Sequence, residues 1–179
     1  MTSEHDLREA LLAAVPSLRA FAISLSGQVD KADDLVQDTL LRALANLHRF
    51  ERGTNLNAWL FTILRNLFHS EYRKRRREVE DPDGSYAGRL KIQPEQGAHL
   101  DFEDFRAALA RLPSDQREAL LLVGASGFSY EEAAGICGCA VGTIKSRVNR
   151  ARLRLAALLN VDDVDDLGPD SMTRAALQG

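Results

Sequence analysis

The sequence predicts an all-α protein of two small helical domains joined by a flexible linker, with a helix-turn-helix in the C-terminal domain. Three observations support this prediction. Apolar residues recur at intervals of three and four over most of the 179 residues, the period of one helix face. No stretch alternates with period two for long enough to form a strand. Residues 78–100 contain two Pro and three Gly without sustained periodicity, which is typical of a linker.

The first half is predicted to form a helical domain over residues 1–77. Apolar residues follow the helical period over 7–25, and Pro16 is expected to begin a second helix at its first turn. A cleaner apolar stripe runs over 31–48. The last helix of this domain is entered through the polar turn "ERGTNLN" and ends in "YRKRRR".

A second domain is predicted over residues 101–160. Its first helix begins near Phe102 and stops at Pro113, and the next helix runs over 114–125. Gly127 lies where a left-handed C-cap is expected. An acidic tail over 161–179 follows this domain and is expected to fray.

A helix-turn-helix is predicted within the second domain. Ser129 and Glu132 have the spacing of a capping box and open the short helix "YEEAAGIC", which Gly138 ends. After a short turn, a basic helix begins near Val141 with an apolar face at intervals of three and four. Ala140, at its entry, has no side-chain oxygen with which to cap this helix. Two short helices joined by a tight turn form the motif that places its second helix in the DNA major groove.

The basic helix concentrates positive charge in a chain whose formal net charge is -3. Its stretch "VGTIKSRVNRARLRL" holds five cations and no acid. A solvated helix face is the alternative, but such a face usually carries acids four residues from its cations. Arg and Lys donate to guanine, Asn pairs with adenine, and further cations suit phosphates. The candidate residues for duplex DNA are Thr143, Lys145, Ser146, Arg147, Asn149 and Arg150.

A second basic site follows four aromatic residues of the first domain. Arg73 and Lys74 open the cationic run, and the same helix carries Trp59, Phe68 and Tyr72 besides Phe61. Cations at a helix C-terminus also favour the helix dipole, and each aromatic residue alone is as well explained by the core. As a group they favour a surface for single-stranded nucleic acid, which needs stacking rings and charge for the backbone.

An enzyme is the least favoured class. The sequence contains no nucleophile–base pairing, no phosphate-cradling glycine loop and no cluster of metal ligands, so neither a catalytic site, a metal nor a cofactor is expected. Cys137 and Cys139 are one residue apart, too close for an ordinary disulfide and only half of a zinc site, and are expected to be small buried fillers. The apolar runs are short and the N-terminus lacks a signal peptide, so we expect a cytoplasmic protein without a membrane segment.

Three motifs resemble the signatures of bacterial ECF (group IV) RNA polymerase sigma factors. They are "DDLVQDTLLRAL", "NLNAWLFTILRN" and "GFSYEEAAGICGCAVGTIKSRVNRARLRL", in that order, within a similarity over about residues 7–158. The strings "SEYRKRRREVED" and "ICGCAVGTIKSR" further resemble the alphaproteobacterial general-stress-response sigma factors of EcfG type. The resemblance implies a protein that binds RNA polymerase core and directs promoter-specific initiation of transcription, with general stress response genes as its expected targets.

The resemblance also implies roles for particular residues. The first domain would be sigma region 2, and the second would be sigma region 4, which reads the −35 element as duplex DNA. Residues implied to bind the β′ clamp helices of the polymerase are Asp34, Gln37, Asp38 and Leu41. Those implied to open and capture the −10 element are Thr54, Asn55, Asn57, Arg65 and Asn66, with Arg73 and Lys74 on the backbone. Further implied partners are the β flap and a small anti-sigma factor, and no stable homo-oligomer is expected.

Two other hypotheses use parts of the same sequence. A stand-alone helix-turn-helix transcription regulator would explain residues 102–158 but leaves the aromatic and basic helix of the first half without a task. A sigma-like decoy that binds only an anti-sigma factor should carry a receiver domain, for which this chain is too short. Such a decoy should also lose the DNA-facing cations, which are intact here.

Overall fold

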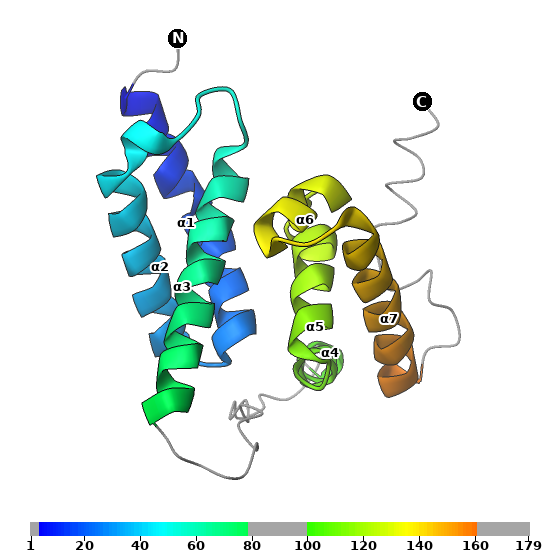
Figure 1. The fold of residues 1–179 in the computed structure, drawn as a ribbon. Helices are drawn as coiled ribbons and strands as arrows, with labels where there is room; N and C mark the ends of the chain where they lie inside the picture. Colours follow the sequence, from blue (N-terminus) through cyan, green and yellow to red (C-terminus); the bar gives the residue numbers. More distant parts are fainter. Residues whose placement is uncertain (1–3, 79–99, 161–179) are drawn as a thin grey trace. The chain divides into compact units, whose positions relative to one another are not determined.

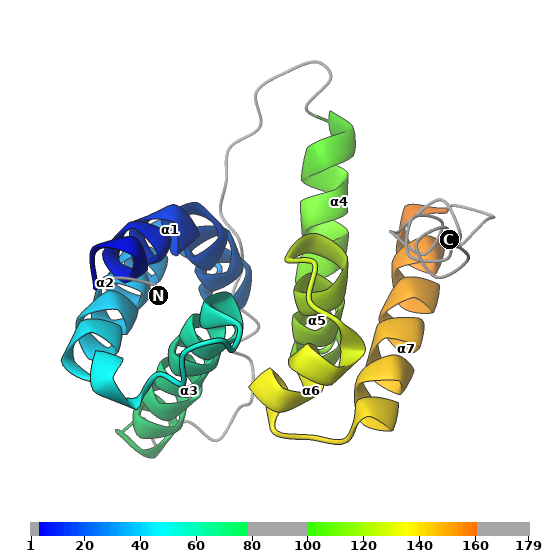
Figure 2. The same ribbon diagram turned by 90° about the horizontal axis from the view of Figure 1, so that it is seen from above.

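The computed structural model describes residues 4–78 and 100–160, which form two helical units (Figures 1 and 2). The linker over 79–99 and the tail over 161–179 lie outside the described residues. The N-terminal unit contains α1 (Glu4–Ser26), α2 (Val29–Ala45), the 3-10 helix η1 (Leu47–Arg49) and α3 (Leu56–Glu78). The C-terminal unit contains α4 (Leu100–Ala110), α5 (Ser114–Leu120), the π-helical turn η2 (Leu121–Ala125), α6 (Tyr130–Cys137) and α7 (Val141–Leu159). The predicted all-α fold of two small domains is confirmed.

The N-terminal unit is a bundle in which α1, α2 and α3 each contact the other two. The aromatic rings of Phe21 and Phe61 meet at the centre with centroids 5.0 Å apart. Leu18, Leu60 and Leu64, from the same two helices, are completely buried. Burial of such side chains stabilises a fold by about 1.5–3 kcal/mol each, so this shared core holds the three helices together.

The prediction that Pro16 begins a second helix is wrong. Residues 4–26 form one continuous helix, with Pro16 in its interior. Proline has no N–H to donate to the carbonyl of Leu12, which is normally costly. Here Leu12 is 69% exposed, so water can hydrate that carbonyl, while Leu11 and Leu18 on the opposite side stay buried. Packing of the apolar face on α2 and α3 therefore overrides the local preference of proline.

A surface ion pair joins α1 to α2 beside their short connection. Arg19 Nε donates to Asp33 Oδ1 at 2.6 Å, and this hydrogen bond and charge raise the pKa of the Arg19 guanidinium. Both side chains are about half exposed, so the pair adds little stability but keeps Asp33 turned toward α1. Gly27 ends α1 with a φ of 69°, a backbone conformation that suits glycine.

The core of the C-terminal unit lies where α7 packs on α5 and α4. In both views α5 and α7 run side by side (Figures 1 and 2). The helix expected over 114–125 is present, but its last turn widens to a π-helix in which the Ser126 N–H donates to the Leu121 carbonyl at 2.9 Å. Gly127 then turns the chain with a φ of 74°, at the predicted left-handed cap.

The helix-turn-helix is formed by α6 and α7. The Ser129 hydroxyl accepts from the Glu132 N–H and the Glu132 carboxylate accepts from the Ser129 N–H, both at 3.0 Å, so the predicted capping box is confirmed. Gly138 ends α6 in the left-handed region with a φ of 65°. Ala140 precedes α7 without a side-chain cap, as expected. The capping box and Gly138 therefore fix the two ends of α6, and the chain then enters α7 through a short turn.

Replacing Pro16 with alanine should stabilise the N-terminal unit. Alanine at an interior helical position restores one backbone hydrogen bond, so the free energy of unfolding should rise by about 1 kcal/mol or more. Thermal and urea unfolding of Pro16→Ala would measure this. Ser17→Ala, at the neighbouring exposed position, is the control. It removes the 3.3 Å hydrogen bond from the Ser17 hydroxyl to the Ala14 carbonyl and should change stability by about 0.5 kcal/mol or less. A loss of stability in Pro16→Ala would contradict the continuous helix.

Candidate nucleic-acid interface and partner surface

The helix α7 divides into an inner apolar face and an outer polar face. Ile144, Val148 and Leu155 are at most 1% exposed and anchor the inner face in the core of the unit. These residues are four and seven positions apart, so they share one side of the helix. Polar residues on the other side point outward, whereas Arg152 is only 8% exposed and belongs to the buried side. The helix therefore presents a polar ridge whose direction is set by its core residues.

The predicted duplex-binding residues occupy this ridge unequally. Lys145, Asn149 and Arg150 are exposed, whereas Thr143 and Ser146 are half-buried. The Lys145 ammonium lies 5.7 Å from the centre of the Tyr130 ring, a cation–π contact with the first residue of α6. Sequence reasoning missed Tyr130, because only the fold brings the start of α6 beside α7.

Arg147 differs from its neighbours on the ridge. Its side chain is only 25% exposed, and its Nε lies 3.4 Å from Asp115 Oδ2. Its Nη1 also donates to Cys139 Sγ at 3.9 Å. The basic helix contains no acid, as predicted, but α5 contributes the carboxylate of Asp115, which is 32 residues from Arg147 in sequence. Arg147 thus contacts two groups of its own unit, Asp115 and Cys139, besides any contact with DNA that its position suggests.

The turn before α3 is ordered by its own polar side chains. Thr54 donates from its hydroxyl to the Glu51 carbonyl at 2.7 Å, and Asn55 Oδ1 accepts from the Ala58 N–H at 3.2 Å. Asn55 is therefore the N-cap of α3, a job that its residue type suits. Gly53, with a φ of 93°, allows the reversal. Thr54, Asn55 and the adjacent Asn57 are exposed, so the turn presents polar groups in a fixed arrangement.

Further along α3, the predicted −10 residues lie at or near the surface. Asn66, Arg73 and Lys74 are exposed, and Arg65 is half-buried. Lys74 Nζ lies 3.9 Å from the Glu78 carboxylate, an exposed pair of little energetic weight. The structure therefore leaves these cations accessible over the last turns of α3.

The four aromatic residues of α3 have different surroundings. Phe61 is 1% exposed and belongs to the core, and Trp59 packs on Phe50 with ring centroids 5.3 Å apart. In contrast, Tyr72 is 44% exposed and stacks on the half-buried Phe68, with centroids 6.4 Å apart. Tyr72 is thus the exposed ring of the four, and it lies with Phe68 next to the cations.

The predicted polymerase-binding residues form a continuous exposed stripe on α2. Asp34, Gln37, Asp38 and Leu41 all point to solvent, with Leu41 58% exposed. The opposite side of the helix, with Leu35 and Val36 among others, is buried. A stripe of acids ending in an exposed leucine suits a partner helix that offers cations and one apolar contact.

Comparison with known proteins identifies the family. Residues 11–78 match the family description "Sigma-70 region 2", and residues 102–155 match "Sigma-70, region 4". The ECF RNA polymerase sigma factor EcfG of Rhodopseudomonas palustris (strain TIE-1) is 75% identical over 179 residues, which cover 100% of this chain and 99% of that protein. This chain belongs to the ECF family of RNA polymerase sigma factors.

Two further relatives support this sigma factor assignment. The ECF sigma factor SigC of Mycobacterium tuberculosis (strain CDC 1551 / Oshkosh) is 39% identical over 145 residues, which span 79% of this chain and 77% of that protein. The sigma factor RpoE of Bartonella quintana, solved in complex with the anti-sigma factor NepR, is 61% identical. Its structure covers 88% of this chain and 99% of its own, with a TM-score of 0.79.

The family assignment confirms the main functional predictions. The chain is an EcfG-type ECF sigma factor and not an enzyme, and sigma factors bind RNA polymerase and promoter DNA. Both region 2 and region 4 are present in order, so a stand-alone helix-turn-helix regulator no longer accounts for the chain. The full-length identity with a sigma factor also disfavours the decoy hypothesis.

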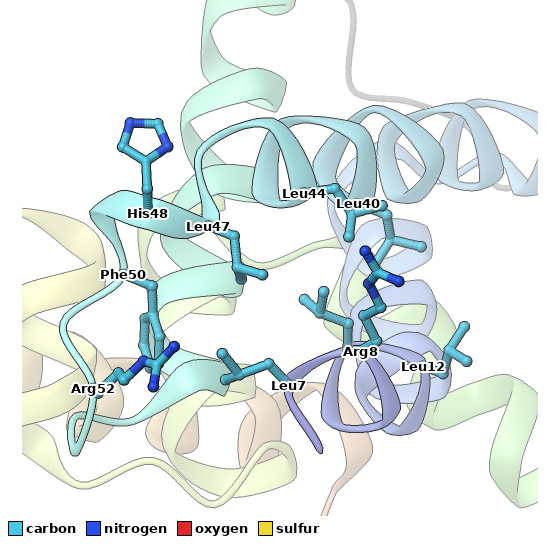
Figure 3. A pocket seen from close by; sticks show the side chains of 10 residues that line it. Leu7, Arg8, Leu12, Leu40, Leu44, Leu47, His48, Phe50 and Arg52 are labelled. Atoms are coloured by element: carbon cyan, nitrogen blue, oxygen red, sulfur yellow. The ribbon is translucent and has the colours of Figure 1, made fainter. Parts of the chain in front are cut away.

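A groove of about 860 Å³ lies in the region 2 unit of this sigma factor, beside the stripe on α2 (Figure 3). Leucine side chains from α1, α2 and η1 converge on it, and Leu12 and Leu44 are 69% and 48% exposed. Arg8, His48 and Arg52 also line it. Since Leu44 follows Leu41 by one helical turn, the groove continues the stripe as an apolar surface with basic residues around it.

Helix α1 is long and apolar enough to pass a simple test for a membrane span, over His5–Ser26 with a mean hydropathy of 1.3. The sequence prediction had found no such segment from its short apolar runs. In the structure, Leu11, Leu18 and Phe21 of this helix are buried against α2 and α3. Part of the apolar surface of α1 therefore belongs to the core of the region 2 unit.

The capping role of Asn55 can be separated from any contact with DNA. Asn55→Ala should lower the free energy of unfolding by about 1 kcal/mol, because the Ala58 N–H loses its acceptor. Asn55→Asp keeps that acceptor and should stay within about 0.5 kcal/mol of the wild type. Thermal unfolding measures both variants. Asn66→Ala, an exposed asparagine within α3, is the control and should not destabilise; equal stability of Asn55→Ala and wild type would exclude the cap.

Proposed function

We propose that this sigma factor engages promoter DNA through two surfaces, one on each unit, and polymerase through the stripe on α2. The observation that carries the proposal is the separation of faces on α3 and α7. Each helix buries an apolar face in its own unit and leaves polar and basic residues uncovered. Two basic surfaces within a chain of net charge -3 suit binding to two separate segments of a polyanion.

The −35 element is read by α7 in the major groove. Lys145, Asn149 and Arg150 are the exposed readers, with Thr143 and Ser146 beside them. A lysine or arginine recognises guanine O6 and N7, and asparagine recognises adenine N6 and N7, so these residue types read sequence directly.

The −10 element is captured by the turn before α3 and by α3 itself. Asn55 and Asn57 offer amide groups of the kind that hydrogen-bond to the edges of an unpaired base. Phe68 and Tyr72 provide a stacked pair of rings on which displaced bases can stack. Thr54, Arg65 and Asn66 complete this surface, while Arg73 and Lys74 bind the backbone of the opened strand.

Polymerase core is bound through Asp34, Gln37, Asp38 and Leu41, which face the β′ clamp helices. The groove beside Leu44 extends this surface with apolar contacts. The region 4 unit contacts the β flap.

Regulation follows from the relatives. The RpoE protein of Bartonella quintana forms a complex with the anti-sigma factor NepR, and it is 61% identical to this chain. We infer that a small NepR-like anti-sigma factor holds this sigma factor inactive until stress releases it. The genes whose transcription it directs are those of a general stress response. It acts in the cytoplasm and forms no stable homo-oligomer.

Run-off transcription with purified bacterial core polymerase and a pool of genomic promoter fragments tests this function. Specific initiation should require the sigma factor and should fall at least about fivefold in Lys145→Ala and in Arg150→Ala, since each good base contact is worth about 1–3 kcal/mol. Arg111→Ala removes an exposed charge just after the end of α4 and is the control. If core polymerase binds the protein but initiates on no fragment, the assignment of the DNA-reading surfaces is wrong. If core polymerase does not bind the protein, the assignment of the polymerase surface is wrong.

The polymerase surface has a matched pair of test residues on α2. Asp38→Asn should raise the Kd for core polymerase about fivefold, because it removes a charge that is worth about 1 kcal/mol at an interface. Asp33→Asn makes the same change on the same helix, but Asp33 is held by Arg19 and faces α1. It should change the Kd less than twofold. Equal effects of the two variants would remove Asp38 from the interface.

A further inference from the structure

Arg147 stands at a junction of three elements in the C-terminal unit. Its guanidinium contacts Asp115 in the first turn of α5, at 3.4 Å, and Cys139 in the turn between α6 and α7, at 3.9 Å. Arg147 itself lies in the second turn of α7. One side chain thus ties the recognition helix both to the helix on which it packs and to the turn that precedes it.

The start of α7 has few other polar restraints. Ala140 cannot cap the helix, and the first amides are held only by the Ala140 carbonyl, which accepts from Thr143 at 3.0 Å and from Ile144 at 3.3 Å. Gly138 turns the chain without a side chain. The apolar contacts of Ile144 and Val148 set the depth of the helix, but such contacts are non-directional. A planar guanidinium that donates in fixed directions can restrain rotation and tilt.

We propose that Arg147 is a positioning residue of the −35 reader and that Asp115 is its partner. The pair fixes the start of α7 relative to α5, so that Lys145, Asn149 and Arg150 project toward the DNA in a fixed register. Arg147 does not itself read a base. The inference rests on the proposed function of α7 and revises the role expected for Arg147.

A role of Arg147 in DNA contact and a role in positioning α7 predict opposite effects on DNA binding when the Asp115 carboxylate is removed. If Arg147 contacted DNA, the Asp115 carboxylate would compete with the phosphate or base for its guanidinium, and removing that carboxylate would strengthen binding. If Arg147 positions α7, removing the carboxylate loosens the helix and weakens specific binding. Asp115→Asn is the cleanest substitution, because asparagine keeps the shape of the side chain and removes the charge. The sign of its effect therefore separates the two roles.

The first experiment measures holoenzyme binding to a duplex that carries the −35 element of a promoter recovered by run-off transcription, and to the same duplex with that element scrambled. Asp115→Asn and Arg147→Ala should each lower the ratio of specific to scrambled affinity about five- to tenfold. The double variant should be within about twofold of either single variant, because both remove one interaction. Arg147→Lys should recover part of the loss, since it restores the charge without the planar fork.

Salt dependence supplies a second readout in the same assay. Arg150→Ala, one turn further along α7 and exposed, is the matched control for loss of a cation that contacts DNA. It should reduce the slope of log K against log salt by about 0.9, the loss of one phosphate contact, or abolish discrimination at one base pair. Arg147→Ala should leave the slope unchanged. Stronger binding by Asp115→Asn, or a fall of about 0.9 in the slope for Arg147→Ala, overturns the proposal.

Amide hydrogen exchange on the full chain without DNA separates this inference from the proposed function. Protection of the amides over 144–148 should fall several-fold in Asp115→Asn and in Arg147→Ala but not in Arg150→Ala. If this pattern appears while wild-type holoenzyme does not distinguish the scrambled duplex, the proposed DNA reading fails and the positioning pair stands. Unchanged protection in both variants overturns the positioning role.

Discussion

The burial of one apolar face on each DNA-facing helix is the constraint on which the rest of this sigma factor depends. Ile144, Val148 and Leu155 bury one side of α7, and Leu60 and Leu64 bury one side of α3. At about 2 kcal/mol per buried side chain, these contacts outweigh any surface ion pair in the molecule. Because the core residues set the rotation of each helix, they also decide which polar residues face outward, and the DNA surfaces follow from the packing.

Electrostatics then acts on surfaces that the packing has already oriented. The chain has a net charge of -3, yet ten of its 23 lysine and arginine residues lie at the end of α3 and along α7, while acids line α2. Like charges close together repel, which costs stability but concentrates attraction for a polyanion. The structure moderates this cost locally: Asp115 pairs with Arg147, and Glu78 lies near Lys74.

Much of this arrangement could be predicted, because its signals are local. The capping box of Ser129 and Glu132 and the end of α6 at Gly138 depend on neighbouring residues, and both were predicted correctly. Pro16 was predicted wrongly, because its local preference for a helix start is weaker than the burial of the apolar face that continues past it. The aromatic residues of α3 shared one pattern in sequence, and only their packing separated Phe61 in the core from Tyr72 at the surface.

The sequence by itself determined the helical class, the two domains, the helix-turn-helix and the family, since helical period, caps and motifs are written within a few neighbouring residues. The tertiary structure alone decided which members of each motif are available to a partner. Asp115 and Arg147 are 32 residues apart, and Tyr130 and Lys145 are 15 apart, so no local pattern links them. They meet because burial of the apolar faces brings α5, α6 and α7 together, and contacts made by packing have no signature in local spacing.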